Sequence, residues 1–334
     1  MKETLTHYQE PINTHITQKL SQARLQEAGA WGHEVQQRLA RFCTQGKGVR
    51  ASLVCAAYNF FETDLPEHVL KTAAGLELIH AGLLIHDDIM DEDDTRRNMP
   101  SSHMHYAQLN THHPNPKHTG QSLAICEADI AYFLGLSMLD SRIIHRAARI
   151  FALVGVAQMT DVTNEYAPIH TDDILTCYTN KTARYSIGLP LWIGAMLANQ
   201  EDLADALYEI GVHAGIVYQL RDDELGLFGK PEITGKPQGS DLRQGKQTIY
   251  IALLKERMDK EAYTQLQETL KNPSEEDIAH IQELITQSGA RNAAKDIHRV
   301  HEEQARALIE QINLSAQHKT FLKEVLAYCG ERQK

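Results

Sequence analysis

Apolar residues recur every three or four positions along most of the chain. Examples are "ASLVCAAYNFF" at 51–61, "IIHRAARIFALVGVAQM" at 143–159 and "LYEIGVHAGIVYQL" at 207–220. This spacing places apolar side chains on one face of an α-helix, whereas the alternating runs that indicate β-strands are missing. The pattern therefore predicts an all-α protein.

Helix-breaking residues separate these segments without forming a linker. They stand at Gly46, Gly48, Pro100 and Pro190, and in the stretches 110–120 and 229–248. None of the breaks is a flexible Gly/Ser-rich tether, and no period of about 20 to 50 residues repeats. We therefore expect one compact helical domain over residues 1–334, in which the charge-rich stretch from about residue 255 forms covering helices.

Composition narrows the class of function. The formal charge of −11 argues against general nucleic-acid binding, which needs clustered Lys and Arg. The opening "MKETLTHYQE" lacks the apolar core of a signal peptide, and no uninterrupted apolar run approaches the roughly 18 residues of a membrane span, so we expect a cytoplasmic protein without a span. The five cysteines include no C-x-x-C pair and are expected to be reduced, buried thiols.

The most distinctive stretch is "LIHAGLLIHDDIMDEDDTRR" at 78–97, where an apolar helix ends in carboxylates followed by two arginines. At about 100° per residue, one stripe of this helix carries His80, Leu84, Asp87 and Asp91, with Asp88 about a quarter-turn aside. The C-terminal end of the helix dipole is negative, so carboxylates at this end are unfavourable unless a bound cation stabilises them. Mg²⁺ binds carboxylate oxygens and completes its coordination with substrate phosphates.

Two interpretations of this cluster remain open from the residues alone. A D-D-x-x-D run can be a solvated helix end, although an EF-hand is excluded because Glu92 stands where the sharp turn needs glycine. Arg96 and Arg97 suit bidentate contacts to a diphosphate, but they can also pair with the carboxylates at 92–94.

A second acidic pair, Asp222 and Asp223, ends the apolar helix "EIGVHAGIVYQLRDDELG", and Gln219 lies on the same face one turn earlier. If the two acidic helix ends face each other, they form a multi-metal site that holds a polyanionic leaving group from both sides. We expect this convergence, which the sequence itself does not show.

Basic residues and histidines supply further candidates, each of which can also be an ordinary surface or core residue. Lys47 and Arg50 flank glycines that let a phosphate approach the backbone, and His80 can donate to a phosphate or hydrogen-bond within the core. Other candidates are Lys181, Thr182, Lys236 and Lys246. The histidine-rich stretch 103–118 has no cysteine partner, and we expect a surface loop rather than a zinc site.

In this order, the motifs resemble those of the trans-isoprenyl diphosphate synthases, the polyprenyl synthetase family that includes geranylgeranyl and farnesyl diphosphate synthases. The resemblance runs from "GKGVR" at 46–50 to "GKQT" at 245–248 and includes "HDDIMDEDDTRR" and "YQLRDDELGLFG" followed by "TGKPQGSDLRQGKQT". Weaker matches are "GQSLAICEAD" and "AQMTD". The resemblance implies an all-α domain built around a central apolar cavity, and a homodimer.

The resemblance also implies roles for individual residues. Three Mg²⁺ ions would be held by Asp87, Asp91 and Asp222, with Asp88, Asp223 and Asp241 supporting them directly or through water. The allylic diphosphate would contact Arg96, Lys181, Lys236 and Lys246, and isopentenyl diphosphate would contact Lys47, Arg50, His80 and Arg97. Thr182 and Gln219 would lie beside the developing carbocation.

The same resemblance places the limit on product length about one helical turn before Asp87, at Gly82 and Leu83, with Ile79 further along. Neither of the first two is aromatic, so we predict a product of twenty carbons, geranylgeranyl diphosphate, or somewhat longer. Three features depart from the usual family pattern: Gln45 precedes Gly46, Gly226 replaces a third aspartate, and the stretch 103–118 is long.

Three other functions compete with this one. A class I terpene cyclase normally carries Asn/Asp, Ser and Glu where this chain has Asp222, Gly226 and Lys230. A noncatalytic subunit of a heteromeric synthase usually lacks one aspartate motif, and both are present here. An HD-type phosphohydrolase, suggested by His86 beside Asp87, leaves the second acidic pair and the arginines unexplained.

Overall fold

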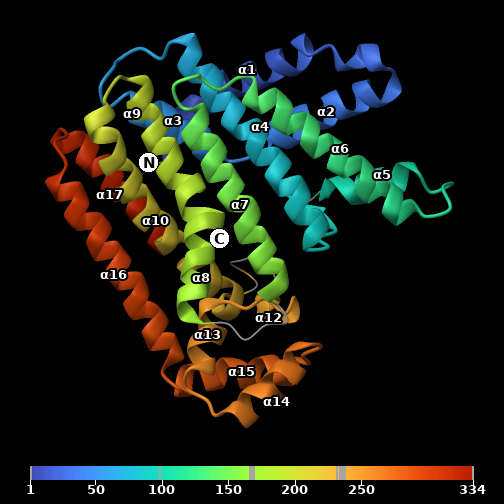
Figure 1. The fold of residues 1–334 in the computed structure, drawn as a ribbon, viewed down its shortest axis with the longest axis vertical. Helices are drawn as coiled ribbons and strands as arrows, with labels where there is room; N and C mark the ends of the chain where they lie inside the picture. Colours follow the sequence, from blue (N-terminus) through green and yellow to red (C-terminus); the bar gives the residue numbers. More distant parts are fainter. Residues whose placement is uncertain (1, 98, 165–169, 231, 233–237, 333–334) are drawn as a thin grey trace. The chain divides into compact units, whose positions relative to one another are not determined.

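A computed structural model describes residues 2–97, 99–164, 170–230, 232 and 238–332, and in this part of the chain nearly all regular structure is helical (Figure 1). The exceptions are two short strands, β1 (Thr95–Arg96) and β2 (Met99–Pro100), which pair antiparallel with Arg96 opposite Met99. The all-α prediction is confirmed.

The chain divides into two compact units, which we describe separately. The N-terminal unit comprises Lys2–His145 and Ile193–Gln200, and the C-terminal unit comprises Arg146–Trp192 and Glu201–Lys334. The single-domain organisation expected from the sequence stays a prediction.

Helices of the N-terminal unit are α1 (Lys2–Gln22), η1 (Leu25–Ala28), α2 (Ala30–Thr44), α3 (Val49–Tyr58), α4 (Glu67–Met90), α5 (Ser102–Leu109) and α6 (Pro116–Leu136). Helix α4 is its core, since α1, α2, α3, α5 and α6 all pack against it. It ends where Glu92 adopts a left-handed φ of 52°. Asp91 caps the last turn by donating its N–H to the Asp87 carbonyl at 2.8 Å.

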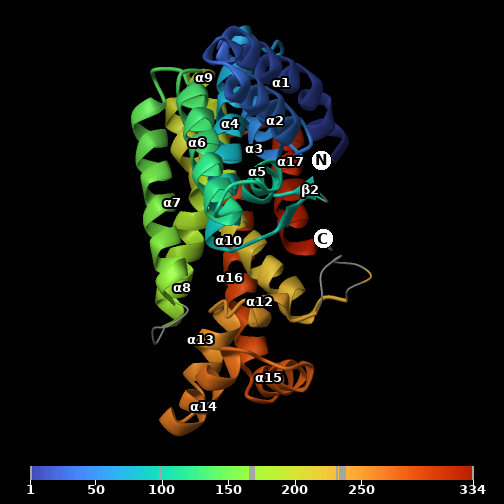
Figure 2. The ribbon, with the colours of Figure 1, turned by 90° about the vertical axis from the view of Figure 1, so that its right-hand side faces the viewer.

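Close approach between α4 and α6 depends on glycine. A Cβ on Gly75 would lie 2.7 Å from the Gly135 carbonyl oxygen, and a Cβ on Gly135 would lie 2.7 Å from the Gly75 carbonyl oxygen. The two backbones therefore touch, which no larger residue allows. In both views α6 lies alongside α4 (Figures 1 and 2).

By length and hydropathy, α4 is the one described helix that could cross a membrane, although 72% of its apolar window is buried inside the protein. The expectation of a protein without a membrane span stays a prediction. The burial of α4 identifies it as a core helix.

The histidine-rich stretch is more ordered than predicted. Residues 102–109 form α5, and His103 is buried with its Nδ1 3.2 Å from the Ser101 hydroxyl. The loop prediction was wrong there because Tyr106 and His103 anchor the turn in the core. Among the cysteines, Cys126 is exposed, so the prediction of burial fails for this one thiol.

In the C-terminal unit, the helices are α7 (Ile144–Asn164), α8 (Thr171–Tyr178), η2 (Thr179–Gly188), α9 (Leu189–Leu197), α10 (Glu201–Phe228), α12 (Ser240–Arg243), α13 (Ile249–Lys255), α14 (Lys260–Leu270), α15 (Glu275–Gln287), α16 (Ala290–Gln311) and α17 (Ala316–Glu331). The first two residues of α7 and the second half of α9 belong to the N-terminal unit. Helices α16 and α17 pack along α10, as expected for covering helices. Helices α14 and α15 gather at one end of α16 (Figure 2).

The segment η2 is a π-helix packed directly on the backbone of α10. A Cβ on Gly215 would lie 2.4 Å from Ala183 Cα, and one on Gly211 would lie 2.6 Å from Gly188 Cα. These glycines bring Lys181 and Thr182, both on η2, close to the polar end of α10. Wide π-turns of this kind are frequent at functional sites.

Candidate functional site

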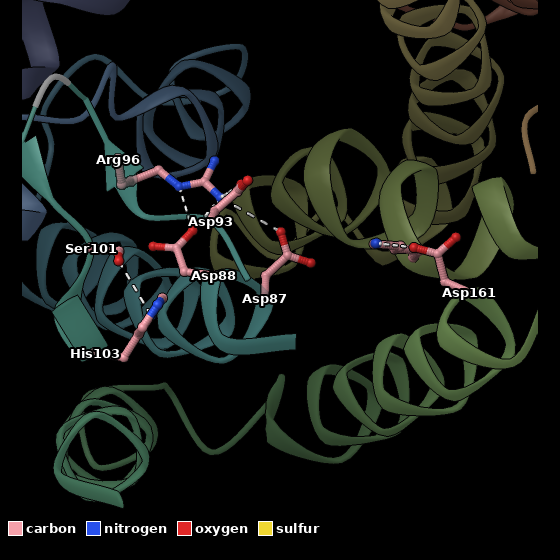
Figure 3. A network of polar contacts seen from close by, with 8 residues as sticks. Asp87, Asp88, Asp93, Arg96, Ser101, His103 and Asp161 are labelled. Carbon is pink, nitrogen blue, oxygen red and sulfur yellow. Dashed lines mark hydrogen bonds and ion pairs between the residues drawn. The ribbon is translucent and has the colours of Figure 1, made fainter. Parts of the chain in front are cut away.

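At the end of α4 the first acidic motif is held by Arg96 (Figure 3). Arg96 Nε donates to Asp88 Oδ1 at 2.6 Å, and Arg96 Nη2 donates to Asp93 Oδ2 at 3.2 Å. Arg96 Nη2 also lies 3.8 Å from Asp87 Oδ2. The guanidinium supplies positive charge at a helix end whose dipole is negative, and pairing with the neighbouring carboxylates is the arrangement that this structure shows.

Asp88 is fully buried, whereas Asp87 and Asp91 are partly exposed. Burial raises the pKa of the Asp88 carboxyl to about 6, against the hydrogen bond from Arg96, which lowers it. Its second oxygen, Oδ2, has no hydrogen-bond partner. Asp87 and Asp91 are the accessible carboxylates of the motif, and Asp88 is its buried support.

The donor set at this end of α4 fits Mg²⁺. Asp87 and Asp91 are one turn apart and offer hard oxygen ligands. Within the described residues, no group of three or more His, Cys, Asp or Glu side chains is arranged to hold a metal ion. Mg²⁺ commonly takes one or two carboxylates and fills its remaining positions with water and substrate phosphates, so two carboxylates suffice.

A cluster of cationic and polar side chains lies nearby in the same unit. Arg50 Nη1 is 3.0 Å from His80 Nε2, and burial, followed by the charges of Arg50, Arg97 and Arg96, lowers the pKa of His80 well below its usual value. His80 is therefore neutral and accepts a hydrogen bond from Arg50, which orients the guanidinium. Arg50 thus contacts His80 and the charge of Arg97 acts on it, while the shared role of the three residues stays a prediction.

Arg97 is positioned by the end of α2. Its Nη1 donates to the Phe42 carbonyl at 2.6 Å, and its guanidinium lies 5.2 Å from the centre of the Phe42 ring. Gly46 lies against it, since a Cβ there would be 2.9 Å from Arg97 Nη2. Lys47 follows Gly46 with an exposed side chain. The Gly46 backbone and Arg97 thus adjoin each other although they are far apart in sequence.

The second acidic motif ends α10 in a buried network. Gln219 Nε2 donates to Asp223 Oδ1 at 2.9 Å, and Thr182 Oγ1 donates to Gln219 Oε1 at 2.9 Å. The Tyr178 hydroxyl donates to Asp223 Oδ2 and accepts the Ile249 N–H at 2.9 Å. This network connects α8, η2, α10 and α13.

The two aspartates of this motif differ in environment. Burial raises the pKa of Asp223 well above its usual value, and the charges of Asp241 and Asp222 act in the same direction. Asp222 is half exposed and forms an ion pair with Arg332, Nη1 to Oδ1, at 2.9 Å. Asp222 is thus the accessible carboxylate and Asp223 the buried one, which repeats the division seen between Asp87 and Asp88.

Packing explains why position 226 is a glycine. A Cβ at this position would lie 2.2 Å from Asp241 Oδ2, so the space belongs to the Asp241 carboxylate. A carboxylate from α12 thus occupies the space that a side chain at 226 would fill. Lys246 donates its backbone N–H to the Asp241 carbonyl at 2.9 Å. Lys236 lies outside the described residues.

Two residues of these networks were not assigned a role from the sequence. Asp161 Oδ2 accepts from Lys181 Nζ at 2.5 Å (Figure 3), although "AQMTD" was noted as a weak match. Tyr178 carried no sequence signal at all. The two acidic motifs lie in different units, so their convergence stays a prediction.

The proposed chain-length residues lie on two faces of α4. Ile79 is buried next to Gly135, and Gly82 is buried against Tyr132 and Ala128 of α6. Leu83 is partly exposed. Gly82 and Ile79 are thus in the seam between α4 and α6, and Leu83 is beside it.

Comparisons with known proteins agree with the motifs. A sequence model of the family described as Polyprenyl synthetase matches residues 33–287. The short chain isoprenyl diphosphate synthase of Methanocaldococcus jannaschii is 34% identical to this chain over 257 residues, which is 73% of each chain. The geranylfarnesyl diphosphate synthase of Aeropyrum pernix is 31% identical over 280 residues, which cover 79% of this chain and 83% of that protein. A crystal structure of geranylgeranyl pyrophosphate synthase from Corynebacterium glutamicum, complexed with isoprenyl diphosphate and magnesium, superposes with a TM-score of 0.86 at 30% identity, covering 97% of this chain and 98% of that one.

Proposed function

This chain belongs to the polyprenyl synthetase family, and on that premise we propose that it is a magnesium-dependent trans-prenyltransferase. It condenses isopentenyl diphosphate with an allylic diphosphate and releases a product five carbons longer, geranylgeranyl diphosphate or one of similar length. The observation that carries this proposal is that one helix of one unit ends in the accessible carboxylates Asp87 and Asp91, with Arg96 3.8 Å from Asp87, and carries His80 within reach of the Arg50 and Arg97 charges.

In the proposed reaction the C–O bond of the allylic diphosphate breaks and the acceptor's double bond attacks the carbocation. A proton then leaves the new chain, and the released diphosphate accepts it. Charge develops mainly on the leaving group, so fixed cations are the main source of catalysis. Bound Mg²⁺ would supply Lewis-acid stabilisation of that charge, and Asp87, Asp91 and Asp222 are the carboxylates proposed to hold it. Three ions remain our expectation for the substrate-bound enzyme.

The chain's own side chains bind and orient the substrates in this proposal. Asp88 holds Arg96, and Asp223 holds Gln219, while Asp241 fills the space left by Gly226. The residues proposed to contact the allylic diphosphate are Arg96, Lys181, Lys236 and Lys246. Those proposed to contact isopentenyl diphosphate are Lys47, Arg50, His80 and Arg97. Thr182 and Gln219, hydrogen-bonded to each other, would face the carbocation.

Family membership also supports a homodimer, which light scattering coupled to gel filtration would measure. A cytoplasmic location stays our expectation; α4, the one described helix apolar enough to cross a membrane, is mostly buried inside the protein.

The test is turnover of labelled isopentenyl diphosphate with dimethylallyl, geranyl or farnesyl diphosphate, with and without Mg²⁺. We expect elongated prenyl diphosphates only with Mg²⁺. A terpene cyclase would instead release hydrocarbons from the allylic substrate alone, a phosphohydrolase would release phosphate, and a noncatalytic subunit would turn over nothing.

The site is tested by Asp87→Ala, which should abolish measurable turnover while the circular dichroism spectrum stays unchanged. Asp94→Ala is the matched control, because Asp94 is an exposed carboxylate of the same run with no proposed role. Near-normal activity of Asp87→Ala would refute the assignment.

A further inference from the structure

Glu77 is an acidic residue in the middle of the core helix α4, and no role has been assigned to it so far. Its side chain is only 6% exposed, and a carboxylate buried to this extent is costly unless hydrogen bonds or nearby positive charge compensate it. Glu77 Oε1 accepts the N–H of Ala51 at 3.1 Å, and Ala51 is itself completely buried. The carboxylate therefore joins α4 to the first turn of α3.

This hydrogen bond takes the place of an N-terminal cap on α3. The helix begins after Gly48, which has a left-handed φ of 56° and offers no side chain to cap the first turn. An N-cap side chain normally accepts the N–H of the second or third helical residue, and Ala51 is the third residue of α3. Glu77 supplies this acceptor from a different helix. A carboxylate is also favourable there because the N-terminal end of the helix dipole is positive.

The capped turn carries Arg50, one of the proposed contacts of isopentenyl diphosphate. Arg50 directly precedes Ala51, and its Nη1 lies 3.0 Å from His80 Nε2. His80 follows Glu77 by three residues, so both side chains lie on the same side of α4. The start of α3 is thus tied to α4 at two neighbouring points, through the backbone N–H of Ala51 and through the guanidinium of Arg50.

Glu77 also acts on Arg97, a second proposed contact of the same substrate. Burial lowers the pKa of the Arg97 guanidinium, and the charge of Glu77 is the strongest influence that opposes this lowering. One buried carboxylate is therefore linked to two cations of the proposed site. It acts on Arg97 through its charge and on Arg50 through the hydrogen bond to the adjacent residue.

We propose that Glu77 is a positioning residue for isopentenyl diphosphate, which holds Arg50 in place by capping α3 from α4. The inference rests on the proposed function, in which Arg50 binds the diphosphate of this substrate and Glu77 does not touch it. Without the cap, the Ala51 N–H is buried and unpaired, and the first turn of α3 relieves this only by moving. The Arg50 side chain moves with that turn, so binding of isopentenyl diphosphate weakens.

Three substitutions at position 77 separate the hydrogen bond from the charge. Glu77→Gln keeps an acceptor oxygen at the same distance along the side chain and removes the charge. Glu77→Asp keeps the charge but is one methylene shorter, so its oxygens no longer reach the Ala51 N–H. Glu77→Met fills a similar volume without an acceptor, and it reports on the cap even if the aspartate variant fails to fold.

The experiment measures kcat and the KM values for isopentenyl diphosphate and geranyl diphosphate with the full-length protein and Mg²⁺, after circular dichroism has shown that each variant is folded. We expect KM for isopentenyl diphosphate to rise about tenfold in Glu77→Asp and Glu77→Met, because a buried N–H loses its partner. The KM for geranyl diphosphate and kcat should change by less than about threefold, and Glu77→Gln should stay within about threefold of wild type in all three.

Thr72→Val is the matched control. It removes a buried polar group from the same helix, 1% exposed and without a proposed role, and its kinetic constants should equal those of wild type. A control that raised KM for isopentenyl diphosphate as much as Glu77→Met would overturn the proposal, because any buried polar group of α4 would then have the same effect.

Three results at position 77 would also overturn it. The first is a wild-type KM for isopentenyl diphosphate in folded Glu77→Met. The second is an equal rise in KM for both substrates, which indicates a general structural role. The third is a Glu77→Gln variant as impaired as Glu77→Met, since the charge and not the cap would then be responsible. Failure of the proposed function is distinguishable from all of these, because wild type itself would then form no elongated product.

Discussion

Replacing Glu127 with glutamine is expected to stabilise the protein at neutral and alkaline pH. Glu127 is a completely buried residue of α6, and Arg38 Nε lies 3.6 Å from its Oε2. Hydrogen bonding from the Ser102 and Tyr106 side chains lowers the pKa of its carboxyl, but by less than burial raises it. Burial raises the pKa of Glu127 from 4.5 to about 7, and the attraction of Arg38 opposes that rise only in part.

The raised pKa determines the sign and the size of the effect. Between pH 4.5 and 7 the folded protein keeps a proton that the unfolded chain releases, so the free energy of unfolding falls as pH rises through this window. At about 1.4 kcal/mol per pKa unit, the loss is about 3 kcal/mol above pH 7. The carboxamide of the Glu127→Gln variant stays neutral and mimics the protonated carboxyl, so this loss should disappear.

Thermal unfolding at pH 5, 6, 7 and 8 measures the effect. With about 2.1 cal/mol/K of unfolding entropy per residue, 3 kcal/mol raises Tm by about 4 °C if the whole chain unfolds together. The rise is about 9 °C if the N-terminal unit, about 150 residues, unfolds by itself. The variant should exceed wild type in Tm at pH 8 and match it at pH 5.

Glu34→Gln is the control, because Glu34 is about one-third exposed and paired with His105 at 2.7 Å. It should leave the pH dependence of Tm close to that of wild type. Parallel Tm profiles for wild type and Glu127→Gln would refute the reasoning, since a carboxyl that is ionised in both states at pH 5 contributes no such slope. Glu127→Ala should destabilise at every pH, because it leaves a cavity where a completely buried side chain stood.

Three other outcomes follow from the site. Tyr178→Phe removes the hydroxyl between Asp223 and the Ile249 N–H, so two buried groups lose a hydrogen-bond partner. The free energy of unfolding, measured with denaturant, should fall by about 1–3 kcal/mol. An unchanged unfolding midpoint would contradict this. Arg97→Ala should raise KM for isopentenyl diphosphate at least tenfold, about 1.4 kcal/mol, with a smaller change in KM for the allylic substrate; equal changes in both would argue against the assignment. EDTA should abolish turnover and excess Mg²⁺ should restore it, whereas activity that persists after chelation would exclude a role for the metal.

The sequence by itself determined the helical class, the family and the order of the motifs. Apolar spacing is a local property, and a helix that buries one face needs it whatever its neighbours are. The acidic ends of α4 and α10 could be recognised for the same reason, since one turn of helix places Asp87 next to Asp91 and Gln219 next to Asp223. The shared role of Arg50, His80 and Arg97 was implied only by resemblance.

Tertiary structure decided which members of each motif are buried and what holds them. Tyr178 is 45 residues from Asp223, and Ala51 is 26 residues from Glu77, so no local pattern pairs them. Gly226 looked like a lost ligand in the sequence, and packing shows that the Asp241 carboxylate occupies the space beside it. Gly48 likewise offers α3 no capping side chain, whereas Glu77 of α4 supplies an acceptor there. Such arrangements depend on contacts between helices, because the space beside a residue is set by its neighbours in the fold and not by those in the chain.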